Sequence, residues 1–180
     1  MQLRREGPVG GFRLNADRDC GHLPAIPNRE SKAMPTESGT ADQKTRIARQ
    51  FIEAIPHSRD LGMELLEIGP GWVLMALDYD TRFVGDPETG VLHGGVVTAL
   101  LDTSGGASVM VHPAAPGGTA TIDLRIDYMR GAEPGKRLFA RAECYRITRS
   151  VAFVRAFAYT SSIEEPVAAA HGAFTVEGAA

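Results

Sequence analysis

The chain has 180 residues, of which 43% are hydrophobic and 23% are charged, and its formal net charge is −3. This composition predicts a globular protein with one packed core, and the charge balance argues against a nucleic acid as the main partner. The first 30 residues lack the apolar core of a signal peptide and no run approaches the roughly 18 apolar residues of a membrane span, so we expect a cytoplasmic protein that does not enter a membrane.

Residues 1–40 differ in composition from the rest of the chain. They are rich in Gly, Pro and charged residues and show neither the period of a helix nor that of a strand. Such a segment has too little apolar surface to offset the entropy of ordering, so we expect a disordered N-terminal extension. Residues 41–180 are predicted to form a single domain. The sequence leaves open whether residues 1–33 belong to the native protein, because Met34 is an alternative start.

The first predicted elements are a helix and a hairpin. Apolar residues recur at helical spacing within residues 41–55, and Pro56 is expected to stop this helix. Two apolar runs flank the Gly-Pro-Gly at residues 69–71 and predict two strands joined by a tight turn. A loop over residues 85–90 is expected to follow, because this stretch holds two glycines and a proline.

The stretch from Gly94 to about Val111 is apolar on almost every side, which predicts a long helix buried within the protein. Residues 121–129 alternate apolar and polar side chains, the period of a half-buried strand, and a turn is expected at residues 131–135. We expect this strand and the runs that follow it to pair in chain order as a four-stranded meander. The order of elements predicts an α+β fold in which one antiparallel sheet curls around the central helix. The further strand-like runs are 136–148, 150–161 and 166–177.

One carboxylate, Asp102, interrupts the apolar helix nine residues after His93. Burying an unpaired carboxylate is costly, so a buried Asp102 points to a function, whereas a partly exposed or capped Asp102 is an ordinary polar residue of a helix. At the start of the helix, Gly94 and Gly95 leave backbone N–H groups at the positive end of the helix dipole, where they can bind a carbonyl oxygen as it becomes negative. At about 1.5 Å per residue, Asp102 lies roughly 12 Å from Gly94 along the helix. If both groups act on one substrate, they must come from two copies of the chain, which predicts a two-fold symmetric dimer.

The segments DPETGVLHGGVVTALLDTSGGAS and TIDLRIDYMRGAEPGK carry the most specific pattern in the sequence. They hold an HGG-x6-D motif from His93 to Asp102, followed by a strand with Asp123 and Tyr128. Over about residues 57–177 the chain resembles the hotdog-fold acyl-CoA thioesterases of the PaaI-like (phenylacetic acid degradation) group. The resemblance implies an antiparallel sheet wrapped around one long central helix. It also implies an acyl-CoA substrate, homodimers that often pair into tetramers, and neither a cofactor nor a metal.

The resemblance also assigns roles within the site. The Gly94 N–H of one subunit would polarise the thioester carbonyl, and Asp102 of the other subunit would act as general base or as nucleophile. His93 would shape the site around the carbonyl and the water. Thr121 would orient the water or the carboxylate.

Three further residues are candidates for substrate binding. Gly95 extends the anion-binding end of the helix, although a glycine there can also serve packing alone. Arg149, in a predicted turn, could hold a CoA phosphate or be a solvated turn residue. Asp86 stands where similar sequences often have an Asn that positions water. A carboxylate at that position can accept hydrogen bonds but repels Asp102 if the two are close.

Other catalytic constellations are missing from the sequence. Cys20 and Cys144 form no CxxC pair, and no HxH, HExxH or Cys/His cluster predicts a metal site. There is no G-x-S-x-G elbow, no P-loop and no GxGxxG. His57 and His112 lie beside prolines and are expected in loops, and His171 is expected in a strand.

Hydrolysis of an acyl-CoA thioester is thus the predicted function, with two alternatives. A hydratase or dehydratase acting on acyl thioesters would need a His–carboxylate pair over the substrate, which His93 and Asp102 of different subunits could supply. A non-catalytic acyl-CoA-binding module would bind the ester without releasing a thiol. The sequence leaves open the acyl group, dimer against tetramer, and the role of Asp102 as base or nucleophile. Gly105 and Gly106 suggest space beyond the carboxylate.

Overall fold

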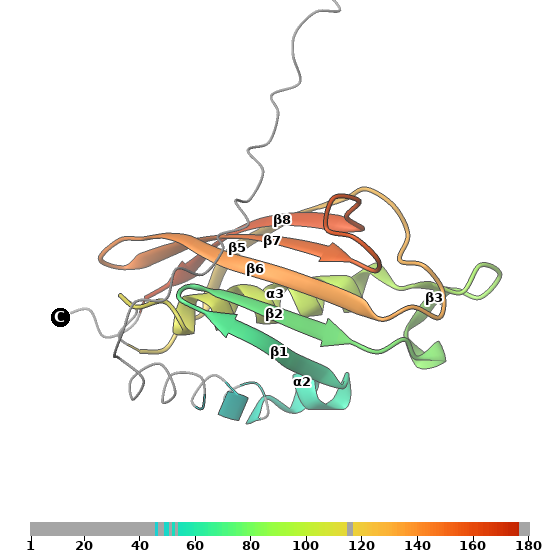
Figure 1. Cartoon of the computed structure of the whole chain (residues 1–180), viewed down its shortest axis with the longest axis horizontal. Helices are drawn as coiled ribbons and strands as arrows, with labels where there is room; N and C mark the ends of the chain where they lie inside the picture. The colour runs from blue at the N-terminus through green and yellow to red at the C-terminus, as the bar shows by residue number, and fades with distance from the viewer. Residues whose placement is uncertain (1–45, 47–48, 51, 53, 115–116, 177–180) are drawn as a thin grey trace, which may run out of the picture. The chain divides into compact units, whose positions relative to one another are not determined.

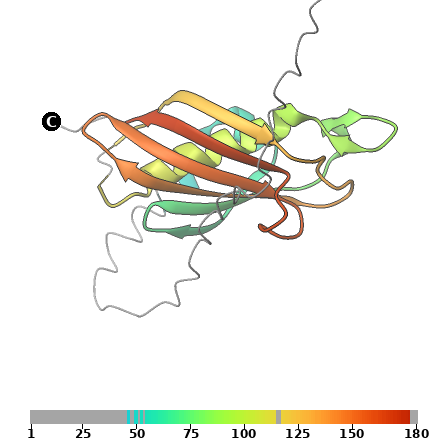
Figure 2. The same cartoon turned by 90° about the horizontal axis from the view of Figure 1, so that it is seen from above.

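The structure, a computed structural model, describes residues 46, 49–50, 52, 54–114 and 117–176. The predicted extension over residues 1–40 lies outside this part of the chain, so the division at residue 40 stays a prediction. Six strands form one antiparallel sheet in the order β1-β2-β6-β7-β8-β5 (Figures 1 and 2). The strands are β1 (Met63–Gly69), β2 (Trp72–Leu77), β5 (Thr121–Tyr128), β6 (Leu138–Ile147), β7 (Val151–Tyr159) and β8 (Ala168–Thr175).

One long helix, α3 (Gly94–Met110), packs against one face of this sheet (Figure 1). Buried and half-buried residues alternate along β6 and β7, so one face of each strand is turned to the core. Many of the buried residues are alanines, and such small side chains let the helix lie close to the sheet. The predicted α+β hotdog fold is confirmed. The buried alanines of the two strands are Ala140, Ala142, Ala152, Ala156 and Ala158.

The hairpin predicted around residues 69–71 is present, and β1 and β2 are joined there by Pro70 and Gly71. Gly71 has a φ of +79°, a left-handed backbone conformation that glycine adopts without steric cost. The turn chemistry of the Gly-Pro-Gly therefore sets the register of the first two strands.

The helix predicted over residues 41–55 falls largely outside the described residues. Those described from 46 to 54 are helical, and the helix stops before Pro56, as expected. Pro56 also begins a second short helix, α2 (Pro56–Asp60), because proline fits the first helical position, where no N–H is needed. The loop expected at His57 is therefore helical.

The loop predicted over residues 85–90 is a small two-stranded ribbon instead. β3 (Val84–Asp86) follows a short 3-10 helix, η1 (Thr81–Phe83), and pairs with β4 (Val91–Leu92). The His93 N–H donates to the Phe83 carbonyl at 2.8 Å, so this ribbon anchors the start of α3.

The predicted four-stranded meander is wrong at its first strand. β5 does not pair with β6; it lies at the edge of the sheet and pairs with β8, with Thr121 opposite Phe174. The segment expected as a turn at residues 131–135 is thus part of a longer connection across the sheet. Alternation within a strand shows which side chains face the core but not which strand lies beside it. The strand is also less buried than expected, since Ile122 and Tyr128 are 55% and 50% exposed.

Candidate active site

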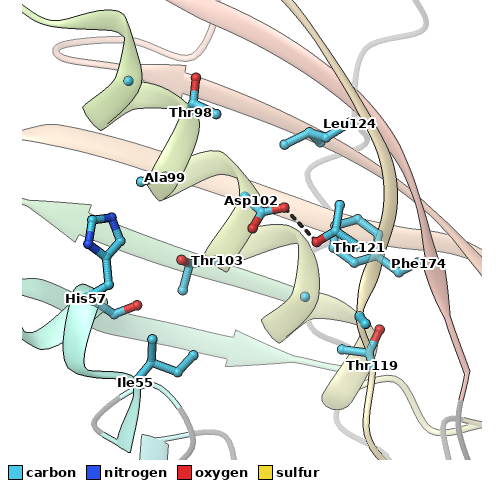
Figure 3. Close-up of a pocket in the computed structure, with 14 residues that line it drawn as sticks. Ile55, His57, Thr98, Ala99, Asp102, Thr103, Thr119, Thr121, Leu124 and Phe174 are labelled. Carbon is cyan, nitrogen blue, oxygen red and sulfur yellow. Dashed lines mark hydrogen bonds between the residues drawn. The ribbon is translucent and has the colours of Figure 1, made fainter.

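Asp102 lines an open cavity of about 570 Å³ between α3, α2 and the neighbouring ends of β5 and β8 (Figure 3). The residues of α3 that line it recur every three or four positions, so they share one face of the helix. Apolar side chains from the other elements complete the wall, so that a carboxylate stands in a largely apolar cavity. The α3 residues in the lining are Gly95, Thr98, Ala99, Asp102, Thr103 and Gly106, and the apolar side chains from outside α3 are Ile55, Leu124 and Phe174.

Asp102 is held by Thr121, as the dashed line in Figure 3 shows. The Thr121 hydroxyl donates a hydrogen bond to Asp102 Oδ1 at 2.8 Å. Thr121 opens β5, so the edge position of this strand brings the two side chains together. The second carboxylate oxygen of Asp102 has no hydrogen-bond partner in the described part of the chain, which leaves it able to accept a proton or attack a ligand.

The start of α3 is capped by His93. His93 Nδ1 accepts a hydrogen bond from the Gly95 N–H at 3.0 Å, and the His93 carbonyl accepts one from Val96. An accepting Nδ1 carries no proton, so the ring in this arrangement can donate only from Nε2. The N–H of Gly95 is therefore occupied, whereas no acceptor for the Gly94 N–H lies among the described residues. Of the two predicted anion-binding donors, only Gly94 is open.

The carbonyl side of the same glycine is also held. The Tyr128 hydroxyl donates to the Gly94 carbonyl at 2.7 Å, and the Thr98 hydroxyl lies 3.1 Å from the same oxygen. Gly94 and Tyr128 line a second cavity of about 360 Å³. Asp102 lines the first cavity and lies eight residues farther along α3, so within one chain a single carbonyl cannot contact both groups.

Asp86 and Arg149 lie away from both cavities. Asp86 accepts hydrogen bonds from the Thr89 hydroxyl at 2.6 Å and from the Glu88 N–H at 3.1 Å, and it thereby shapes the β3–β4 turn. The Thr89 hydroxyl, with the Glu88 N–H second, holds the pKa of the Asp86 carboxyl below its usual range. Arg149 is exposed at the turn between β6 and β7. One chain therefore brings neither residue to Asp102.

The fold and this geometry agree with comparisons to known proteins. Residues 89–167 match the family model of the thioesterase superfamily. The structure of a Pseudomonas aeruginosa protein is 39% identical to this chain, with a TM-score of 0.67, and the match covers 73% of this chain and 98% of that one. This chain belongs to the thioesterase superfamily. The predicted kinship with the PaaI-like hotdog thioesterases is confirmed.

Two further relatives connect this thioesterase to named proteins. The medium/long-chain acyl-CoA thioesterase YigI of Escherichia coli K12 is 29% identical over 130 residues, which are 64% of this chain and 83% of YigI. An Asn-to-Asp mutant of the phenylacetic acid degradation protein PaaI from Thermus thermophilus is 27% identical, with a TM-score of 0.58, and the match covers 67% of this chain and 97% of PaaI. The prediction of an acyl-CoA thioesterase agrees with the name of the first relative.

The structure of this thioesterase adds two residues that the sequence did not predict to be in the site. His57 lines the first cavity from α2, and Figure 3 shows its ring directed toward α3. The neighbouring Ser58 also lines the cavity, and its buried hydroxyl has no hydrogen-bond partner in the part of the chain that the structure describes. Both residues follow Pro56 in α2. A proline is typical of the first position of a helix, so Pro56 could have predicted that His57 and Ser58 are helical.

The space suggested beyond Asp102 is only partly present. A Cβ at Gly105 would lie 2.7 Å from Phe174, whose ring fills the space beside that glycine. A Cβ at Gly106 would meet nothing closer than 3.8 Å, and Gly106 lines the cavity. The cavity of this thioesterase therefore reaches Gly106, and the Phe174 ring closes it at Gly105.

Within residues 46–176, as far as they are described, no group of three or more His, Cys, Asp or Glu side chains could hold a metal ion. The helices described there are all too short or too polar to cross a membrane.

Proposed function

We propose that this protein hydrolyses an acyl-CoA thioester to a free acid and CoA. The observation that carries the proposal is Asp102, which stands in a largely apolar cavity with one oxygen held by Thr121 and the other open. The relative YigI is named a medium/long-chain acyl-CoA thioesterase, so acyl chains of that length are the first substrates to test.

The proposed reaction uses two groups of α3, the Gly94 N–H and the Asp102 carboxylate. The Gly94 N–H donates to the thioester oxygen, which gains negative charge as the carbonyl carbon is attacked. Asp102 takes a proton from a water that attacks this carbon, or its open oxygen attacks directly and forms an anhydride that water then hydrolyses. In both routes the carbon–sulfur bond breaks and CoA leaves as the thiolate, which then takes up a proton.

We infer that the two groups come from different subunits of a homodimer. Gly94 and Asp102 are separated by roughly 12 Å along one helix, too far for one carbonyl. The free edge of β5 supports a partner there, because β5 ends the sheet and two apolar residues, Ile122 on β5 and Met129 directly after it, are 55% and 56% exposed. A second copy paired along β5 would bury them, and pairing of two such dimers would give a tetramer.

The remaining site residues keep the roles that the resemblance implies. His93 holds the start of α3 and shapes the site, and Thr121 orients the carboxylate. Gly95 lines the Asp102 cavity, but its N–H is bound by His93, so we propose that it borders the substrate without donating to it. Asp86 and Arg149 lie away from both cavities, so they are proposed to contact substrate only from the partner's side. A cytoplasmic location stays a prediction from the sequence.

The proposal is tested by thiol release from acyl-CoAs of increasing chain length, with wild type beside Asp102→Asn. We expect turnover by wild type and a loss of at least about a hundredfold in the variant, because the amide keeps the shape but cannot act as a base. Asp60→Asn is the matched control, since Asp60 is an exposed carboxylate at the end of α2, and it should leave turnover unchanged.

Other outcomes would favour the alternatives. Binding of acyl-CoA without thiol release by wild type would indicate a binding module. Hydration of an unsaturated acyl-CoA without thiol release would indicate a hydratase. Equal thiol release by wild type and Asp102→Asn would mean that a different carboxylate acts.

A further inference from the structure

We propose that Tyr128 is a positioning residue, which holds the start of α3 so that the Gly94 N–H points at the substrate carbonyl. This inference rests on the proposed thioesterase function. It concerns a tyrosine on the edge strand β5, to which the resemblance assigns no role and which does not line the cavity around Asp102.

Three oxygens form a triangle of close contacts at the start of the helix. The Tyr128 hydroxyl lies 2.7 Å from the Gly94 carbonyl and 2.7 Å from the Thr98 hydroxyl, which itself lies 3.1 Å from that carbonyl. Each hydroxyl has one proton to donate, and the contact between the two hydroxyls uses at most one of these protons. At least one hydroxyl therefore donates to the Gly94 carbonyl, which can only accept. The phenol is the only member that comes from outside α3, and it ties the helix to β5.

The position of this triangle matters because of the peptide group it holds. The Gly94 carbonyl and the Gly95 N–H belong to one peptide plane, and the N–H side of that plane is bound by His93 Nδ1 at 3.0 Å. The plane is thus fixed at both ends by side chains from outside the helix. The open donor, the Gly94 N–H, lies in the preceding peptide plane, whose His93 carbonyl accepts from the Val96 N–H at 3.0 Å. Only the Gly94 φ and ψ relate the two planes, so holding the Gly94 carbonyl limits the directions that the Gly94 N–H can take.

Glycine makes such a restraint necessary. Gly94 and Gly95 have no Cβ to limit their backbone dihedrals. These two residues therefore lose more conformational freedom when the first turn of α3 becomes ordered than residues with a side chain would lose. A hydrogen-bond donor stabilises a developing oxyanion fully only when it is already aimed at the place where the charge forms. Tyr128 supplies that restraint from a neighbouring strand, without a side chain that would block access to the Gly94 N–H.

The first test needs no substrate. Hydrogen–deuterium exchange is followed on peptides that cover residues 92–100 in wild type, Tyr128→Phe and Tyr145→Phe. Tyr145 is the matched control, because it is a tyrosine on β6 that is 52% exposed and its hydroxyl has no partner within the described residues. We expect faster exchange at the start of α3 in Tyr128→Phe alone, with an unchanged melting temperature. Exchange equal to that of wild type would overturn the proposal.

The second test measures catalysis on an acyl-CoA that wild type hydrolyses. We expect kcat to fall about tenfold in Tyr128→Phe, part of the hundredfold or more that a single oxyanion donor contributes, and to stay unchanged in Tyr145→Phe. The dissociation constant of a thioether analogue, which lacks the carbonyl, should be the same in all three proteins. Addition of Thr98→Val to Tyr128→Phe should lower kcat further, because the carbonyl then loses its second side-chain donor.

The outcomes separate this inference from the proposed function. An active wild type with an equally active Tyr128→Phe variant would overturn the positioning role alone. Weaker binding of the thioether analogue with an unchanged kcat would also overturn it, because Tyr128 would then be a binding residue. A wild type that releases no thiol from any acyl-CoA would overturn both.

Discussion

Two glycine pairs of the same helix meet different neighbours. Gly94 and Gly95 begin α3, where side chains from outside the helix hold its first turn and one N–H stays open. Gly105 and Gly106 lie near its other end, where the ring of Phe174 packs against Gly105. Gly94 leaves an N–H open to a ligand, whereas Gly105 leaves room for a core side chain.

The difference shows that the role of a glycine in a helix depends on which atoms pack against it. Phe174 is 1% exposed, and its ring also lies 3.1 Å from the Cβ position of Gly172 on β8. A Cβ at Gly94 would instead lie at an ordinary contact distance of 3.4 Å from Tyr128. Gly105 therefore affects mainly the stability of the core, whereas Gly94 affects access to an open N–H.

The largest effect is expected where the core ring is removed. Phe174→Ala should lower the free energy of unfolding by about 3–5 kcal/mol, because it leaves a cavity between the two glycines and the sheet. Denaturant unfolding measures this. Phe157→Ala removes a half-buried ring from the face of β7 that is turned away from the core, so it should lower the free energy of unfolding clearly less. Similar losses of free energy of unfolding in the two variants would mean that packing of Phe174 against the glycines stabilises the fold no more than the half-buried Phe157 ring does.

A smaller effect is expected from a methyl group added to the second glycine pair. Gly105→Ala should destabilise the fold by about 1–2 kcal/mol, because its Cβ would overlap the Phe174 ring and this exceeds the gain in helix propensity. Gly106→Ala should be neutral or stabilising by up to about 1 kcal/mol, since its Cβ meets nothing closer than 3.8 Å. Thermal unfolding of the two variants gives the comparison, and a reversed order would contradict it.

The smallest effect on stability is expected at the helix start. His93→Ala should cost about 1 kcal/mol, because the Gly95 N–H loses its side-chain acceptor, whereas His93→Asn should keep most of the cap. Thiol release then separates two roles. If His93 also shapes the site, His93→Asn will be stable but slow. Normal turnover in a stable His93→Asn would restrict His93 to capping.

Much of the fold followed from local patterns. The apolar stretch from Gly94 predicted a helix that runs to Met110, and the Gly-Pro-Gly predicted the first hairpin, because both signals depend on neighbours in the sequence. The neighbour of β5 did not follow, since pairing of Thr121 with Phe174 joins residues more than 50 positions apart. Many registers satisfy the same alternation of polar and apolar residues, and only packing selects among them.

The candidate site divides in the same way. The sequence by itself determined that a carboxylate and a glycine-rich helix start lie on one helix, roughly 12 Å apart, because helical rise converts residue spacing into distance. Only the tertiary structure decided that Thr121 holds Asp102, that Tyr128 holds Gly94 and that Phe174 fills the space at Gly105. These contacts join α3 to the edge strand β5 or to its neighbour β8, and the order of strands depends on long-range burial that no local pattern records.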